Sequence, residues 1–198
     1  MHRNHHARSQ KGFTILELMI ASLVFSTILL LLTYGIIQIG NTYYRGGALV
    51  RTQNANRKAI DAISSAIQYG GSDIRPASGV IYDSASATTG QLCIGNRHFR
   101  FKANSQVAAA DTAWAIVSDD TGTACAASAN RGASTELLGE GMRITKLVIT
   151  NTDNNYKIEL SIAFGDSDLL TGDGLCKSGP GSQFCATSSF ETTVQRRL

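Results

Sequence analysis

The feature that most constrains this chain is a long apolar run near its N-terminus. Residues 13–37 contain only one charged side chain, Glu17. As a helix, a run of this length spans about 37 Å, and the hydrocarbon core of a bilayer is about 30 Å thick. A secretory signal peptide has a shorter apolar core, of about 7–15 residues, followed by a small-residue cleavage site. No such site follows closely here, so the sequence predicts a transmembrane helix over residues 13–37.

The residues before this run are basic and predict its orientation. Residues 1–12 contain Arg3, Arg8 and Lys11 and no acid. These cations account for the whole formal charge of +3, so the rest of the chain is formally neutral. Because basic residues favour the cytoplasmic side of a membrane, we expect a cytoplasmic N-terminus and an extracytoplasmic remainder. A neutral body provides no general field for capturing polyanions, so we expect no nucleic-acid partner.

Glu17 is the unusual residue of the run. A carboxylate within an apolar membrane helix costs about 3 kcal/mol on insertion scales and usually has a partner or a role. Glu17 lies four residues after Phe13, which follows Gly12. A cut between Gly12 and Phe13 creates an α-amine that can pair loosely with Glu17 of the same helix, or with Glu17 of a parallel neighbour staggered by a turn. Such a pair is strong in lipid, where each lone charge is expensive.

Residues 11–18 read KGFTILEL, after a basic head and before an unbroken apolar run. This segment resembles the processing and methylation motif of type IV prepilins. The resemblance implies removal of residues 1–12 by a prepilin peptidase, N-methylation of Phe13, and a role for Glu17 in subunit registration within a helical filament. The implied partners are other pilin subunits, the prepilin peptidase/methyltransferase and the pilus assembly machinery of the membrane, with the lipid bilayer as partner before assembly.

Residues 38–70 show an amphipathic helical pattern, in which isoleucines recur at helical spacing beside small alanines: Ile60, Ile63 and Ile67 with Ala59, Ala62 and Ala66. The pattern indicates a helix that packs one face on a core, and Gly70 with Gly71 is its expected stop. Glycines interrupt the pattern. The sequence leaves open whether the helix bends or melts near Gly35, Gly40 or Gly46.

Short strand patterns replace the helical period after residue 78. The predicted strands are residues 80–82, 91–94, 98–101, 114–117, 143–150, 156–164 and 189–195. The fold class is therefore α+β, a pilin-like long N-terminal helix packed on a C-terminal antiparallel sheet. We expect residues 1–12 to be a basic leader that is removed and residues 13–37 to be a transmembrane and filament-core helix. Residues 38–70 are then an amphipathic stem, and residues 71–198 an extracytoplasmic β-rich domain.

The four cysteines all lie beyond the membrane segment, which suits an oxidising compartment. Cys176 and Cys185 bracket a flexible loop, and a disulfide there contributes about 2–3 kcal/mol in the chain-entropy model. This pairing leaves Cys93 with Cys125, although three pairings are possible. Zinc ligation is the rival interpretation. No C-x-x-C pair exists, however, and His98 is the only histidine outside the basic head.

An acidic loop follows the hairpin that residues 143–150 and 156–164 are predicted to form. Asp166, Asp168 and Asp173 are weak candidates for calcium, since no glutamate closes the loop as in an EF-hand. We therefore assign no metal and no cofactor. His98 has no carboxylate or nucleophile linked to it by motif, and the sequence contains neither a G-x-S-x-G nor a P-loop motif. We expect a protein that is not an enzyme.

The ending FETTV at residues 190–194 is similar to the terminal strand of W-type minor pilins and J-type pseudopilins. Residues 195–198 depart from the Arg-Asn close of those proteins. The favoured function is a structural subunit, a minor pilin, of a type IV pilus-like filament. One alternative is a pseudopilin of a type II secretion system. Another is a single-pass membrane-anchored binding domain that does not polymerise. The sequence does not indicate whether the filament serves adhesion, motility, DNA uptake or secretion.

Overall fold

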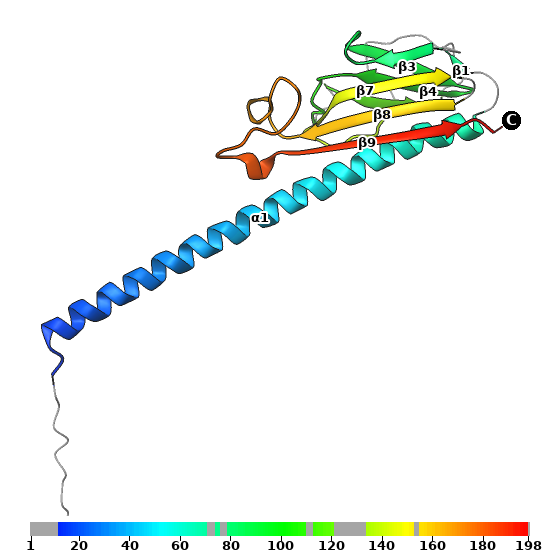
Figure 1. Ribbon diagram of the computed structural model, residues 1–198. Helices are drawn as coiled ribbons and strands as arrows, with labels where there is room; N and C mark the ends of the chain where they lie inside the picture. Colours follow the sequence, from blue (N-terminus) through cyan, green and yellow to red (C-terminus); the bar gives the residue numbers. More distant parts are fainter. Residues whose placement is uncertain are drawn as a thin grey trace, which may run out of the picture. The chain divides into compact units, whose positions relative to one another are not determined.

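A computed structural model describes the residues 12–70, 74–75, 79–109, 113–120, 134–152 and 155–197. Within them one long helix, α1 (Ile15–Tyr69), precedes a region of antiparallel strands, so the predicted α+β class is confirmed (Figure 1). The chain divides into two compact units, one ending at Thr42 and one beginning at Tyr43. The second unit contains the C-terminal part of α1 and all of the strands.

The strands form two sheets where the sequence predicted one. The five-stranded sheet has the order β1 (Ile74–Arg75), β3 (Thr89–Ile94), β4 (Arg97–Lys102), β5 (Ile116–Asp119) and β6 (Thr135–Glu136). The four-stranded sheet has the order β2 (Gly79–Asp83), β7 (Met142–Thr152), β8 (Asn155–Phe164) and β9 (Ala186–Gln195). Every paired strand is antiparallel to its neighbour. Buried side chains of both sheets contribute to one core. Strands that are adjacent in sequence can therefore belong to different sheets and still pack against each other.

Several strand boundaries differ from the prediction, and two of the differences have a clear cause. The strand expected over residues 114–117 begins only at Ile116. The N–H groups of Ala115 and Ile116 donate to the carboxylate of Glu136 at 2.9 and 3.0 Å, so a side chain here takes the place of a strand partner. The last strand begins at Ala186, earlier than the expected Ser189, because β9 pairs with β8 along its whole length.

Strand alternation holds in the predicted hairpin except at two places. In β7 a bulge between Ile144 and Lys146 keeps both Ile144 and Leu147 on the buried face. In β8 strict alternation with the buried Ile162 would place Ala163 on the solvent face, yet Ala163 is fully buried. Leu170 and Cys185, from the loop that follows, pack against Ala163 and cover that face.

The second half of α1 packs on the core through the predicted stripe. Ala59, Ile63 and Ile67 have no exposed surface. The buried side also includes Asn56, whose Nδ2 donates to the carbonyl oxygens of Leu160 at 3.2 Å and Ser188 at 2.9 Å. Because a buried amide is costly without partners, these bonds hold α1 in one register against β8 and β9.

The glycines do not interrupt α1. The helix is continuous from Ile15 to Tyr69, so it neither stops nor melts at Gly35, Gly40 or Gly46. Gly70 ends it, as predicted, and its N–H donates to the carbonyl of Ala66 at 2.7 Å. A Cβ at Gly70 would lie 2.1 Å from Cγ2 of Ile94, so only glycine fits beside β3 here.

A chain of ion pairs crosses the outer face of the four-stranded sheet. Lys146 contacts Glu159 at 2.7 Å, and Lys157 contacts Glu159 at 2.8 Å and Glu191 at 3.0 Å. Glu159 and Glu191 lie opposite each other in register, and the lysines offset their repulsion. Hydrogen bonds from Lys146 and then Lys157 lower the pKa of Glu159 to about 2.

The carboxyl of Glu159 should titrate near pH 2 in the folded full-length chain. The measurement is the ¹³C NMR chemical shift of this carboxyl as a function of pH, with the chain in detergent micelles. Its folded pKa lies below the ordinary value of 4.5, so its stabilising effect is complete above about pH 4.5 and is lost as the pH falls toward 2. In Lys146→Gln the midpoint should rise toward the ordinary value. An unchanged midpoint in that variant would show that Lys146 does not hold the carboxylate.

Candidate processing and assembly site

The first unit exposes an apolar helical surface. Phe13, Leu31 and Ile39 are 83%, 74% and 72% exposed. By length and composition, α1 is a helix that can cross a membrane. The chain therefore fits a protein that is anchored in a membrane by this helix. The helix begins at Ile15 and not at Phe13, so the expected span is shorter by two residues at its start.

Hydroxyl groups inside the apolar run bond to their own helix. The donors Ser22, Ser26, Thr27 and Thr33 reach the carbonyl oxygens of Met19, Ser22, Val24 and Leu29 at 2.8–2.9 Å. An unsatisfied polar group in hydrocarbon costs several kcal/mol, and these bonds remove that cost. Of the polar side chains in this part of the described chain, Glu17 alone carries a charge that lipid cannot accommodate.

Thr14 and Glu17 together form the start of α1. The backbone N–H and the hydroxyl of Thr14 both donate to Oε2 of Glu17 at 2.9 Å. In return the N–H of Glu17 donates to Oγ1 of Thr14 at 3.2 Å. The first helical bond runs from the N–H of Leu18 to the carbonyl of Thr14, also at 3.2 Å. This arrangement is a capping box, in which residues three apart satisfy each other's free groups.

The capping box changes the interpretation of Glu17. The sequence predicted a counter-ion at Phe13, whereas in the intact chain the nitrogen of Phe13 is a peptide nitrogen and Glu17 bonds to Thr14 instead. Both donors of Thr14 are neutral, so they do not offset the negative charge of the carboxylate. Among the described residues Oε1 of Glu17 accepts no hydrogen bond. The carboxylate is thus oriented but not neutralised, and its pairing with a freed α-amine stays a prediction.

The junction between Gly12 and Phe13 is exposed. A Cβ at Gly12 would meet nothing within 4 Å, so the fold itself does not demand glycine there. The rest of the basic leader, including Lys11, lies outside the described residues. Sequence reasoning missed the part played by Thr14. The signal was present as T-x-x-E immediately before an apolar run, which is the pattern of a capping box.

The disulfide expected between Cys176 and Cys185 is present, with Cα atoms 5.7 Å apart. It closes a loop that contains the short 3-10 helix η2 (Ser182–Phe184) and lies after η1 (Ser167–Leu169). Cys93 carries no free thiol. Its expected partner Cys125 lies outside the described residues, so that pairing stays a prediction.

The metal candidates are not brought together. Asp166, Asp168 and Asp173 are exposed, and no group of three or more His, Cys, Asp or Glu side chains is placed to hold a metal within the described ranges. The ammonium of Lys177 donates to the carbonyl of Asp168 at 2.7 Å and occupies part of that loop. His98 is half-buried in β4, with Nε2 3.3 Å from the side-chain oxygen of Gln91. Burial lowers the pKa of His98.

The hydroxyl of Thr14 is expected to keep the first turn of α1 closed. Thr14→Val removes the side-chain half of the capping box, worth about 1 kcal/mol, so the amides of Glu17 and Leu18 should exchange about fivefold faster. Hydrogen exchange by NMR on the full-length chain in micelles measures this. Thr14→Ser keeps the hydroxyl and should exchange like the wild type. Equal protection in the valine variant would mean that the box does not hold the turn.

Comparison with known proteins singles out the same segment. The family described as the prokaryotic N-terminal methylation motif matches residues 7–33. No curated protein and no solved structure matches the chain. The matched range contains the exposed Gly12–Phe13 junction, the capping box and most of the apolar helix. Residues 7–33 therefore carry a prepilin-type N-terminal methylation motif, which supports a type IV pilin-like or pseudopilin-like precursor.

Proposed function

We propose that this chain is a structural subunit, a minor pilin, of a type IV pilus-like filament, and that it is not an enzyme. A prepilin peptidase cuts it between Gly12 and Phe13, Phe13 is N-methylated, and the mature subunit assembles through α1. One observation carries the proposal: the methylation motif coincides with the start of the exposed apolar run of residues 13–37, whose single acid, Glu17, is oriented but not neutralised.

The charge on Glu17 favours association with a neighbouring subunit that supplies a cation. In an apolar environment a carboxylate held only by neutral donors remains expensive and requires a cation. The cut after Gly12 supplies one, because it converts the nitrogen of Phe13 into an α-amine one residue before Thr14. A neighbouring helix staggered by a turn brings its amine to the free Oε1 of Glu17. Apolar side chains along α1, now exposed, pack against like helices once they leave lipid.

The same reasoning assigns a role to each segment of the chain before and after processing. The basic leader, residues 1–12, stays in the cytoplasm until it is removed. Residues 13–37 are the transmembrane and filament-core part of α1, residues 38–70 are the stem, and residues 71–198 form the extracytoplasmic β-rich part. The Cys176–Cys185 disulfide supports an oxidising location for that part. The partners before assembly are the bilayer, the peptidase/methyltransferase and the assembly machinery.

A pseudopilin of a type II secretion system is the second candidate, because such proteins share the methylation motif. The terminal strand is compatible with both candidates, because its sequence is similar to the ending of W-type minor pilins and of J-type pseudopilins. Residues 190–194, which are similar to the J-type ending, lie in β9 at the edge of the four-stranded sheet. Phe190 of this strand lies under the guanidinium of Arg57 from α1, 5.8 Å from its ring centre. The machinery that co-purifies with the native protein separates the two candidates.

Processing should depend on Gly12. In Gly12→Leu the peptidase should fail, whereas the fold should persist because a side chain there has open space. Intact mass spectrometry of protein from its native membrane should find methyl-Phe13 as the first residue of the wild type and Met1 as the first residue of the variant. Gly35→Ala, which changes another glycine with open space, should be processed normally. A wild type that keeps Met1 would favour the anchored domain that does not polymerise.

Assembly should depend on the charge of Glu17. Glu17→Gln keeps an oxygen for the hydrogen bonds of Thr14, so insertion and processing should continue. Loss of the buried ion pair should lower incorporation into sheared filaments at least about tenfold, measured by quantitative immunoblot. Asp61→Asn removes an exposed acid from the same helix and should assemble as the wild type. Normal incorporation of the Glu17→Gln subunit would contradict the ion-pair mechanism.

A further inference from the structure

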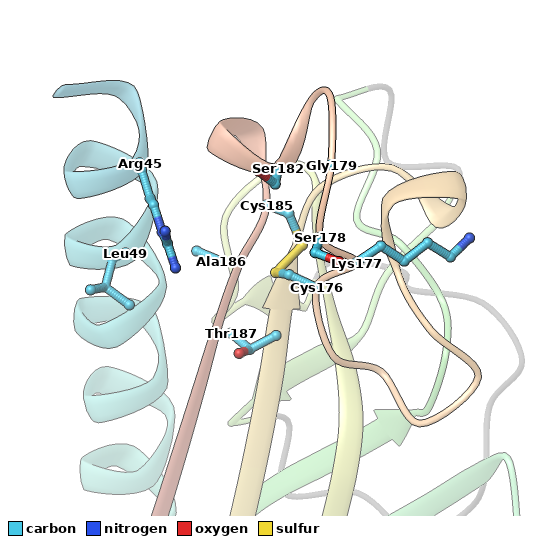
Figure 2. A pocket seen from close by; sticks show the side chains of 10 residues that line it. All are labelled: Arg45, Leu49, Cys176, Lys177, Ser178, Gly179, Ser182, Cys185, Ala186 and Thr187. Carbon is cyan, nitrogen blue, oxygen red and sulfur yellow. A yellow bond between two sulfur atoms is a disulfide. The ribbon is translucent and has the colours of Figure 1, made fainter. Parts of the chain in front are cut away.

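The second unit contains a polar pocket beside α1. Arg45 and Leu49 of α1 form one wall, and the disulfide loop with the start of β9 forms the other (Figure 2). The pocket has a volume of about 370 Å³. The loop and strand residues that line it are Cys176, Lys177, Ser178, Gly179, Ser182, Cys185, Ala186 and Thr187.

The lining is suited to an anion. It includes no acid among the described residues that form it, and three of its residues carry hydroxyl groups, Ser178, Ser182 and Thr187. The guanidinium of Arg45 extends from α1 toward the start of β9 (Figure 2). The ammonium of Lys177 instead points away and donates to a loop carbonyl. Arg45 makes no ion pair within the described residues. A free guanidinium beside hydroxyls matches the charge and geometry of a phosphate group.

Exposed aromatic side chains adjoin this pocket. Tyr43 and Tyr44 immediately precede Arg45 and are 80% and 58% exposed. Phe184, between the lining residues Ser182 and Cys185, is 49% exposed, and its ring centre lies 5.7 Å from that of Tyr44. Aromatic rings with one polar and one apolar end concentrate where a membrane meets water.

The position along the chain places these groups near lipid headgroups. Arg45 follows Ile37, the end of the apolar run, by eight residues. Eight helical residues rise about 12 Å, and the polar headgroup layer on each side of the hydrocarbon is about 5–8 Å thick. The side chain of arginine can extend several ångströms back toward the bilayer. Arg45 and its neighbouring aromatics can therefore reach the headgroup layer.

We propose that the pocket at Arg45 binds the phosphate of a membrane phospholipid in the extracytoplasmic leaflet. Arg45 pairs with the phosphate, the hydroxyls of Ser178, Ser182 and Thr187 complete the site, and the aromatic side chains rest among the headgroups. The lipid holds the second unit against the membrane before assembly. This inference rests on the single-pass orientation of the proposed function.

Native mass spectrometry of the full-length chain in a neutral detergent tests the site. The probe is dioleoyl phosphatidylglycerol, titrated until the first lipid is bound. Arg45→Gln should weaken that first binding about tenfold, the loss expected for one charge-assisted contact to phosphate. Arg51→Gln removes another exposed cation of α1, outside the pocket, and should stay within about twofold of the wild type. Dioleoylglycerol has the same tails without phosphate, and its binding should be the same in all three proteins.

Each other outcome would overturn the proposal. Equal weakening in Arg45→Gln and Arg51→Gln would mean a general attraction of cations to anionic lipid. No weakening in either would remove Arg45 from lipid binding. Inorganic phosphate, added without lipid and bound as tightly as the phospholipid, would make the pocket a site for a free anion. Lost filament incorporation in Arg45→Gln with unchanged lipid binding would place Arg45 against another subunit.

The test is independent of filament formation. It uses unassembled, unprocessed chain, so a negative lipid result leaves the proposed processing after Gly12 and assembly through Glu17 intact. Conversely, a chain that binds lipid at Arg45 but is never cut at Gly12 would refute the pilin function and retain the site.

Discussion

The cost of a carboxylate in an apolar helix is the constraint on which the rest depends. Glu17 occupies the first turn of a run in which the hydroxyls of four serine and threonine residues bond to carbonyl oxygens of their own helix. Its bonds to Thr14 fix its position and cap the helix, yet they leave its charge uncompensated. Insertion of this helix in a membrane includes the free-energy cost of placing the Glu17 carboxylate in an apolar environment, and a neighbouring cation removes that cost. In the function that we propose, the motif therefore links processing, which makes an amine, to association.

In the second unit the apolar side of α1 is covered by protein and not exposed as it is in the first unit. The isoleucine and alanine stripe makes ordinary apolar packing contacts there, and Asn56 adds a polar contact that fixes which part of the helix lies against β8 and β9. The disulfide loop covers the end of β8 and brings Phe184 to Tyr44. Near residue 45 the chain thus passes from a surface suited to lipid to one suited to a protein core.

Patterns with strong local causes were predictable from sequence. The apolar run, the stripe on α1, the stop at Gly70 and the main strands follow from periodicity and glycine, which act over a few residues. The division into two sheets, the bulge after Ile144 and the burial of Ala163 were not predictable. Each depends on segments far apart in sequence, such as the loop that brings Leu170 and Cys185 over β8.

The sequence by itself determined the apolar run, the methylation motif at its start and the position of the single acid of that run, because charge and hydrophobicity are properties of residues. Only the tertiary structure showed that the aspartates of the acidic loop form no metal-binding group among the described residues, and that Arg45 lines one pocket together with residues of a loop closed by a disulfide. These are matters of distance between side chains, and distance is set by how the backbone folds.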